Sequence, residues 1–402
     1  MLFTFPSLKI TMLMKKFKSL ASLLVASSLV VSSVGNAFAC TALMITDKSG
    51  KVYSAKTMEF SVPIPSQFMY IPSGTNIISA APNGHDGFTF NTQYPIIGVA
   101  SSIKPTPNAK QVMVIEASNN QGLSLSTNEL TESKSPYIAE PIDSKMLAGN
   151  DLASYLLGNF KTVAEVKQVL QSGNVQVWLP KIEFAGNVAL PEHYILFDKT
   201  GAGIVIEYTD GLQNIYDNPV GVATNSPEFP WHLKNLNNYA FLTNQDKNTG
   251  KFNHLTAVAP DSGSALAGLP SIQISAGRFV KAAFYTNYVR KASTPNDAVV
   301  TLAHIMNNFD RPYDLTVDGA GFSGDAPGST KKTSEVSLYT WMNDKDRNRY
   351  YIRTIDSMNF TTFEIDKLSA IKSVVIIPLN QVNDNNLDGT QMIIDAANKK
   401  AQ

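Results

Sequence analysis

Residues 40–60 read CTALMITDKSGKVYSAKTMEF. The turn-forming residues at 47–50, DKSG, separate two short runs rich in apolar and β-branched side chains, Cys40–Thr46 and Lys51–Ala55. This order is typical of two antiparallel strands joined by a tight turn. The stretch therefore predicts a β-hairpin whose first residue is Cys40, the single cysteine of the chain.

The same pattern of strand, turn and strand returns twice. It covers residues 193–208, with turn residues at 198–201, and residues 341–355, with turn residues at 343–346. Antiparallel hairpins are therefore expected to recur along the chain.

Helical spacing of apolar residues marks three other segments. Residues 151–170 can form one apolar stripe, and helices are predicted over 278–291 and 295–308, the last with Ser293 or Thr294 as its N-cap. Groups of strands separated by groups of helices indicate the α+β class. The sequence shows no low-complexity linker, composition break or repeat.

The amino-terminal segment has the order of a secretory signal. Lysines within residues 15–18 precede an apolar run over 20–34, and the small residues Ala37 and Ala39 occupy the positions that a signal peptidase recognises before Cys40. We therefore expect removal of residues 1–39 by signal peptidase. Two alternatives are an uncleaved membrane anchor and lipid attachment to Cys40, although the run is short for a spanning helix.

Cleavage at this position would leave residues 40–402 as one catalytic domain, exported to the periplasm or outside the cell. The full chain has 33 basic and 33 acidic residues, and the leader carries four of the lysines. The exported part is therefore mildly acidic, which does not favour nucleic acid or an anionic membrane surface as a partner.

A lone cysteine is unusual in an exported protein, because cysteines there commonly pair as disulfides. Away from a cleavage site, the simplest interpretation would be a buried thiol that packs as a small apolar group. Directly at the predicted cleavage site, a lone cysteine indicates a catalytic thiol. A terminal cysteine carries its own base, since an α-amine titrates at about 7.7–8.0 and can accept the thiol proton.

The remaining residues suggest no metal or cofactor. The five histidines match no zinc or cysteine–histidine pattern that we identify, so they are expected to be structural or exposed: His85, His193, His232, His254 and His304. Residues 384–389, with Asp395 twelfth, imitate a calcium loop, but an aspartate replaces its final glutamate. We interpret that segment as a turn.

Four motifs together resemble the choloylglycine hydrolases, a family that includes bile salt hydrolases and penicillin V acylases. They are residues 40–60, DNPVGVATNSPEFPWHLKNLNNY at 217–239, GRFVKAAF at 277–284, and LYTW at 338–341. The resemblance implies an N-terminal-nucleophile hydrolase with a four-layer αββα sandwich of antiparallel sheets. It also implies hydrolysis of linear amides, a small-molecule amide substrate and a homotetramer.

The resemblance assigns roles by position. Cys40 would be the nucleophile, and the side chain of Asn225 would supply half of an oxyanion hole. The other half would be a backbone amide, at Asn128 or Glu129. Arg278 would help to arrange the charges of the site, the alternative being an arginine on a helix surface.

Two positions depart from the family's pattern. Lys56 stands where the family has arginine, and Glu59 stands where it has aspartate. Both keep their charge, although lysine cannot form the bidentate bonds of a guanidinium. We expect activity to be retained, with the two residues in the catalytic site. The alternative is an exposed ion pair between them at a strand end.

The acyl part of the substrate is expected to be bulky and apolar. Phe60, Phe68 and Met69, with Val62 and Ile64, are predicted to lie in the loop after the site strand and to line a pocket, although they could equally be core residues. Candidate substrates are conjugated bile salts, penicillin V and acyl-homoserine lactones. The competing hypothesis is a secreted binding protein or lipoprotein that kept the scaffold and lost catalysis.

Overall fold

The computed structural model describes residues 39–61, 66–101, 112–139, 142, 144–182, 188–317, 334–382 and 388–400. The chain divides into two compact units, one of residues 37–317 with 334–402 and one of residues 1–36 with 318–333. All described residues belong to the first unit. The predicted signal, apart from Ala39, and the calcium-like turn at 384–387 lie outside the described residues.

A six-stranded antiparallel sheet contains the predicted hairpin. Its strand order is β16 (Val222–Ala223), β1 (Ala39–Thr46), β2 (Val52–Phe60), β19 (Val336–Asp344), β20 (Arg349–Thr354) and β21 (Thr361–Glu364).

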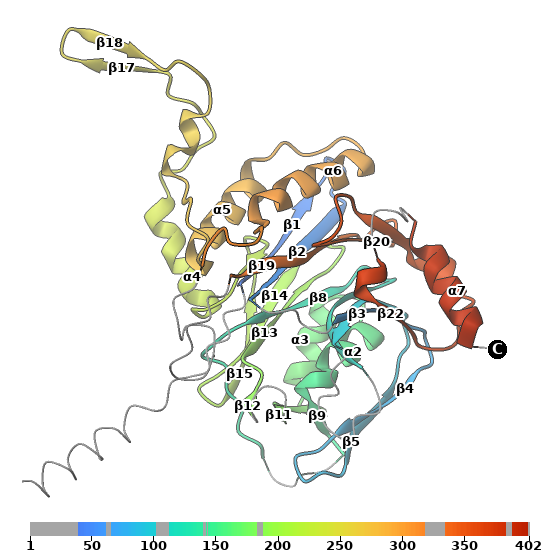
Figure 1. Ribbon diagram of the computed structural model, residues 1–402. Helices are drawn as coiled ribbons and strands as arrows, with labels where there is room; N and C mark the ends of the chain where they lie inside the picture. Colours follow the sequence, from blue (N-terminus) through green and yellow to red (C-terminus); the bar gives the residue numbers. More distant parts are fainter. Residues whose placement is uncertain are drawn as a thin grey trace, which may run out of the picture. The chain divides into compact units, whose positions relative to one another are not determined.

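An eight-stranded antiparallel sheet forms the second layer of strands (Figure 1). Its order is β15 (Leu212–Asp217), β14 (Gly203–Thr209), β13 (Glu192–Phe197), β8 (Ser124–Glu129), β7 (Met113–Asn119), β6 (Ile96–Ser101), β3 (Ser66–Ile71) and β22 (Val375–Pro378).

Short strands pair outside these two sheets. The pairs are β4 (Asn76–Ala80) with β5 (Asp86–Asn91), β9 (Met146–Ala148) with β10 (Gln176–Trp178), β11 (Lys181–Ile182) with β12 (Val188–Ala189), and β17 (Thr249–Phe252) with β18 (Leu255–Val258).

Helices cover the outer faces of the two sheets. Helices α5 (Ser275–Tyr288) and α6 (Pro295–Met306) pack on the six-stranded sheet, where Phe279 and Leu302 join a buried cluster with Leu43. Helices α2 (Gly149–Asn159) and α3 (Val163–Gln171) pack on the eight-stranded sheet. The remaining helices among the described residues are α4 (Phe229–Asn235), α7 (Thr390–Lys400) and the short 3₁₀ helices η2 (Leu236–Tyr239), η3 (Ser264–Gly268), η4 (Asn307–Phe309), η5 (Ile365–Leu368) and η6 (Leu379–Gln381).

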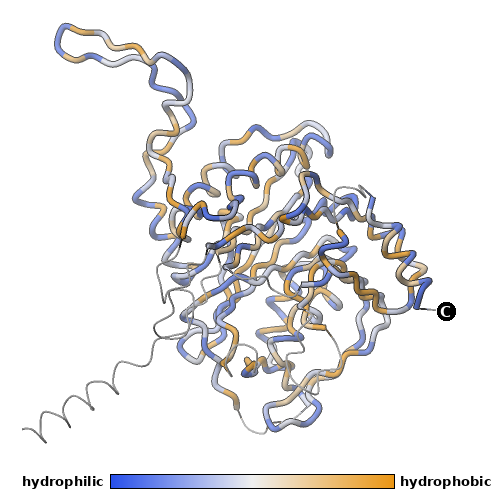
Figure 2. The backbone as a smooth tube through the Cα atoms, viewed as in Figure 1, coloured by the Kyte–Doolittle hydropathy of each residue, from blue (hydrophilic) through white to orange (hydrophobic). Residues whose placement is uncertain are grey.

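A third buried cluster fills the space between the sheets. Met58 and Trp341 from the six-stranded sheet pack there with Tyr70 and Val99 from the eight-stranded sheet. Figure 2 shows the apolar segments concentrated along the strands of both sheets. The predicted α+β class and the αββα order of layers are therefore confirmed.

The predicted elements differ from the observed ones at several places. The helix predicted over 278–291 is observed at Ser275–Tyr288, and the loop predicted around Phe68 and Met69 is strand β3. The apolar stripe over 151–170 is two helices, because Thr162 and Glu165 form a capping box that begins α3. In the last hairpin, Asn343 and Asp344 still belong to β19, and the turn follows them. The turns at 47–50 and 198–201 and the Thr294 cap are confirmed. In the described part of the chain, no helix combines the length and apolar character needed to span a membrane.

Gly98 in β6 lies where β6 and β7 approach each other closely. A Cβ atom at this position would lie 2.1 Å from the backbone oxygen of Glu116 and 2.5 Å from Cα of Ala117 in β7. We expect Gly98→Ala to destabilise the protein by about 1–3 kcal/mol, because backbone on the neighbouring strand must shift. Chemical denaturation measures the change.

The matched control is Gly250→Ala in β17, where the added Cβ would find Phe252 at an ordinary 3.8 Å. Equal midpoints for Gly98→Ala and Gly250→Ala would contradict the assigned packing of β6 on β7.

Candidate active site

Cys40 lies near the start of β1 and is 1% exposed. Its thiol faces the space between the sheets, 3.8 Å from the sulfur of Met58 on β2. Its backbone nitrogen donates a hydrogen bond of 2.7 Å to Oδ1 of Asn225. Burial raises the pKa of the thiol from 9.0 to about 12, against the opposing attraction of Lys56. With Ala39 still attached, the group is therefore a protonated thiol at neutral pH.

Arg278 joins three parts of the site. It extends from α5, is 1% exposed, and donates from Nη1 to the carbonyl of Cys40 and, at 2.8 Å, to Oγ1 of Thr41. Its Nη2 donates to Oδ1 of Asn225 at 2.8 Å. Burial lowers the pKa of Arg278 to about 10, which still leaves it charged at neutral pH. The alternative of a helix-surface arginine is wrong.

Asn225 lies between Cys40 and β8. Its Oδ1 accepts from the backbone nitrogen of Cys40 and from Arg278, while its Nδ2 donates to the carbonyl of Glu129 at 3.2 Å. Because all these bonds require one orientation of the amide, the group presents its N–H side toward β8.

Strand geometry distinguishes Asn128 from Glu129. The backbone nitrogen of Leu130 bonds to the carbonyl of Pro191, beside β13. Backbone groups alternate along a strand, so the N–H of Asn128 points toward β13 and the N–H of Glu129 points away from it, to the side on which the carbonyl of Glu129 accepts from Asn225. The side chain of Asn128 is a donor to the carbonyl of Thr224 at 2.6 Å.

Lys56 and Glu59 do not form an exposed ion pair. Both are fully buried, and they point to opposite faces of β2 because their positions differ by an odd number. Lys56 instead donates to Glu116 on β7 at 2.5 Å and to the carbonyl of Thr127 at 3.0 Å. Desolvation opposes the charge of Lys56, but attraction to Cys40 and Glu116 outweighs it and raises the lysine's pKa.

Sequence reasoning missed Glu116, which no local motif marks. Its carboxylate accepts from Lys56, from the hydroxyl of Tyr339 at 2.7 Å and from the indole of Trp341. Three donors on one buried carboxylate fix its position, and therefore fix the ammonium of Lys56, which lies 3.9 Å from the same Met58 sulfur that contacts Cys40.

Glu59 lies opposite Ala39 in the pairing of β1 with β2. Burial raises its pKa from 4.5 to about 7, with the charge of Arg278 opposing the shift. Its Oε1 accepts from Ser337 at 3.3 Å, and its Oε2 has no hydrogen-bond partner among the residues described. Glu59 is thus the strand partner of the residue that precedes Cys40.

The predicted pocket residues are placed differently from expectation. Phe68 and Met69 lie in β3, and the prediction of a loop there is wrong. Both are 0% exposed, Phe68 in the cluster between the sheets and Met69 in the cluster under α2. Side chains alternate across a strand, so neighbouring residues enter opposite cores. Phe60 ends β2 and is also buried.

Two of the histidines are buried beside Asn225, while His85, His254 and His304 are exposed. Nε2 of His232 lies 2.8 Å from the carbonyl oxygen of Asn225, and burial lowers the pKa of His232 to about 4, so its ring is neutral. His193 contacts Thr224.

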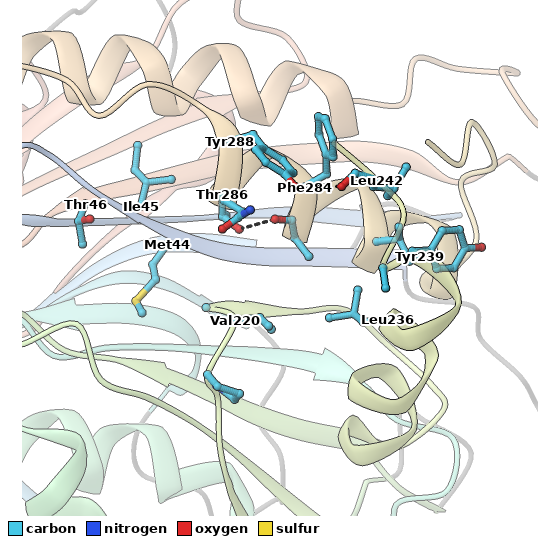
Figure 3. Close-up of a pocket in the computed structure, with 16 residues that line it drawn as sticks. Met44, Ile45, Thr46, Val220, Leu236, Tyr239, Leu242, Phe284, Thr286 and Tyr288 are labelled. Carbon is cyan, nitrogen blue, oxygen red and sulfur yellow. Dashed lines mark hydrogen bonds between the residues drawn. The ribbon is translucent and has the colours of Figure 1, made fainter. Parts of the chain in front are cut away.

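A cavity of about 470 Å³ lies farther along β1 (Figure 3). Met44, Val220, Phe284 and Tyr288 are among the residues that line it. None of the predicted site residues that the structure describes lines this cavity, and the predicted pocket residues Val62 and Ile64 lie outside the described residues. Within the described part of the chain, no group of three or more His, Cys, Asp or Glu side chains could hold a metal ion.

Comparison with known proteins defines the class. Residues 40–385 match the model of the linear amide C–N hydrolases, choloylglycine hydrolase family. The protein is therefore a hydrolase of linear amide C–N bonds. The chain belongs to the choloylglycine hydrolase family.

Relatives with two different names, a bile salt hydrolase/transferase and a penicillin V acylase, align with most of the chain. A bile salt hydrolase/transferase of Clostridium perfringens is 26% identical over 354 residues, which cover 88% of this chain and 95% of the relative. A penicillin V acylase of Pectobacterium atrosepticum is 26% identical over 282 residues, which cover 69% of this chain and 68% of the relative.

Solved structures share the fold. A conjugated bile acid hydrolase variant from Clostridium perfringens aligns with a TM-score of 0.71 and 23% identity, over 86% of this chain and 98% of the other. Penicillin V acylase from Agrobacterium tumefaciens aligns with a TM-score of 0.64 and 22% identity, over 85% of this chain and 92% of the other.

The raised thiol pKa predicts the reactivity of the uncleaved chain. With residues 39 and 40 still joined, the rate of alkylation by iodoacetamide should rise about tenfold per pH unit up to pH 10, with no plateau near 9. Lys56→Met should slow it further at every pH, because the nearby cation that favours the thiolate is lost.

Lys51→Met is the control, since Lys51 forms a half-exposed pair with Asp346 on the surface. Intact mass monitors both the leader and the adduct, and circular dichroism verifies folding. A rate that levels off below pH 9 would contradict the assigned environment of Cys40.

Proposed function

We propose that the protein is an exported amidase in which Cys40, freed as the first residue, is the nucleophile. The α-amine accepts the thiol proton, and the sulfur attacks the amide carbonyl carbon. The C–N bond then breaks as the amine product leaves with that proton, which gives a thioester on Cys40. Water, activated by the same amine, hydrolyses the thioester and releases the acid.

The observation that carries this proposal is the anchoring of the Cys40 backbone. Its nitrogen donates to Asn225 at 2.7 Å, and its carbonyl accepts from Arg278. While Ala39 is attached, that nitrogen belongs to an amide and is not basic. Cleavage would turn the same atom into an amine beside its own thiol, without any second residue acting as base.

Glu59 supports the same mechanism. Its buried carboxyl group lies opposite residue 39 and has an oxygen, Oε2, for which the described residues offer no donor. An α-ammonium group formed at Cys40 would meet that carboxylate. Lys56, on the other face of β2, would favour the thiolate form.

The oxyanion would be held by Asn225 and the backbone of Glu129. The Nδ2 group of Asn225 contacts the carbonyl of Glu129, and strand alternation directs the N–H of Glu129 to the same side. We therefore favour Glu129 over Asn128 as the second donor, with Asn128 supporting the Thr224 backbone.

Export before folding is consistent with the placement of Ala39. This residue is 5% exposed and paired with Glu59 within β1 and β2. A peptidase needs an extended, accessible substrate, so cleavage after Ala39 should precede formation of the sheet. We propose that the leader, residues 1–39, directs the chain to the periplasm or the medium, where it is removed.

The substrate class is proposed from the relatives. They are named as bile salt hydrolases, conjugated bile acid hydrolases or penicillin V acylases. We therefore propose an apolar-acyl amide, with conjugated bile salts, penicillin V and acyl-homoserine lactones as candidates. Phe60, at the end of β2, is the predicted pocket residue nearest in sequence to Glu59.

The amino terminus of the secreted product is the first test. Its intact mass should correspond to residues 40–402 with a free amine. That product should release amine from at least one of glycocholate, penicillin V and a long-chain acyl-homoserine lactone. Cys40→Ser should reduce the rate by several orders of magnitude. An acylated terminus, or no release from any of the three, would support the binding-protein alternative.

Asn225→Ala tests the oxyanion hole. Loss of one such donor should lower kcat by roughly a hundredfold to a thousandfold with the fold intact. The matched control is Asn238→Ala on η2, whose exposed side chain donates to the side chain of Asn235. An unchanged kcat for Asn225→Ala would remove that residue from the oxyanion hole.

Self-association is a separate proposal. The hairpin of β17 and β18 exposes Phe252, Leu255 and Val258, each more than 60% exposed. Apolar side chains on a projecting hairpin support the homotetramer implied by the family resemblance. Phe252→Ser with Leu255→Ser should lower the mass measured by light scattering. A mass equal to that of the parent protein would exclude this surface.

A further inference from the structure

A second buried polar network lies behind Asn225. His193 of β13 and Glu207 of β14 are 1% and 0% exposed, and Nδ1 of His193 lies 3.0 Å from Oε1 of Glu207. Nε2 of His193 lies 3.0 Å from the carbonyl oxygen of Thr224, the residue before Asn225. The mechanism proposed above assigns no part to this pair.

The acceptors around His193 indicate which of its ring nitrogens carries a hydrogen. A carbonyl oxygen only accepts, so Nε2 of His193 carries a hydrogen that it donates to Thr224. Nδ1 faces a carboxyl oxygen that already accepts the backbone N–H of Phe229 at 2.9 Å. A hydrogen between Nδ1 and Oε1 of Glu207 completes the second hydrogen bond of the ring. The pair holds the ring in the one form that donates to Thr224, as carboxylates do for histidines elsewhere.

The peptide unit between Thr224 and Asn225 is held at both ends. The carbonyl of Thr224 accepts from His193 and from Asn128, and the N–H of Asn225 donates to Oγ of Ser275 at 3.0 Å. The carbonyl of Asn225 is held in turn by His232 at 2.8 Å and by Ser275 at 3.0 Å, so the peptide planes on both sides of the Asn225 Cα are fixed, and with them the direction in which its side chain leaves the backbone. Four separate elements, β8, β13, α4 and α5, supply these contacts.

We propose that His193, held by Glu207, is a positioning residue that aims the Asn225 side chain at the reacting carbonyl. The inference rests on the proposed role of Asn225. The side chain of His193 contacts Glu207 and the carbonyl of Thr224, not Cys40. It acts through the Thr224 carbonyl, so its loss should lower turnover without weakening substrate binding.

Two substitutions at position 193 separate the two hydrogen bonds. The amide nitrogen of His193→Gln occupies roughly the place of Nε2 and can still donate to Thr224. The amide nitrogen of His193→Asn occupies roughly the place of Nδ1, keeps the contact with Glu207 and cannot reach Thr224. Both substitutions remove the ring, so a loss of packing alone affects them alike.

Kinetics on the amide that the wild type hydrolyses fastest give the first readout. We expect His193→Asn to lower kcat about tenfold or more with KM within twofold, and His193→Gln to retain most of kcat. In an Asn225→Ala background, His193→Asn should lower kcat no further, because the side chain through which His193 acts has already been removed. The exposed His85→Asn is the control.

Hydrogen exchange provides a readout that needs no turnover. Peptides that span Thr224–Ser226 should exchange about tenfold faster in His193→Asn than in the wild type, and at nearly the wild-type rate in His193→Gln. Measurement in Cys40→Ser protein removes any influence of bound product.

The two proposals fail in different ways. If Asn225→Ala keeps full turnover, the oxyanion assignment fails, and exchange in the Thr224–Ser226 peptides still decides whether His193 fixes this backbone. If Asn225→Ala is impaired while His193→Asn keeps its kcat, or if His193→Asn and His193→Gln lose kcat equally, the positioning role is overturned.

Discussion

The geometry around Cys40 depends on the burial of two cations, one on each side of β2. A buried charge is tolerated only when hydrogen-bonding partners replace the water it has lost. Arg278 finds them in the carbonyl of Cys40 and the side chain of Asn225, and Lys56 finds them in Glu116 and a backbone carbonyl. Each cation thereby fixes the groups that surround the thiol.

The alternation of side chains along a strand places these two cations on opposite faces of the six-stranded sheet. Within β1 and β2, Cys40 and Lys56 face the eight-stranded sheet, whereas Thr41 faces α5 and meets Arg278. The thiol is thus held between an ammonium in the intersheet layer and a guanidinium in the helix layer. Burial still dominates, since it raises the thiol pKa to about 12 in the uncleaved chain. Under the proposed mechanism, the base that generates the thiolate would have to be very close, as an α-amine on the same residue would be.

The supports of Asn225 show why the four layers matter to the chemistry. Its side chain contacts β1, β8 and α5, and its backbone is held by residues of α4, α5 and, through Thr224, β13. No single element could orient an amide so fully. Because the supporting side chains include His193 and Glu207, which the core encloses, the orientation of the site is set by the same packing that stabilises the sandwich.

The sequence by itself determined the hairpin at Cys40, the α+β class, the family and most of the residues around the thiol. These follow from turn residues, apolar periodicity and contiguous motifs, all of which are local. Only the tertiary structure decided that Lys56 pairs with Glu116, that Glu59 lies on the other face of β2, and that Phe68 and Met69 are core residues of β3. Partners of a buried charge are chosen by which strands meet across the sandwich, and sixty positions separate Lys56 from Glu116 in the chain. No local pattern records that meeting.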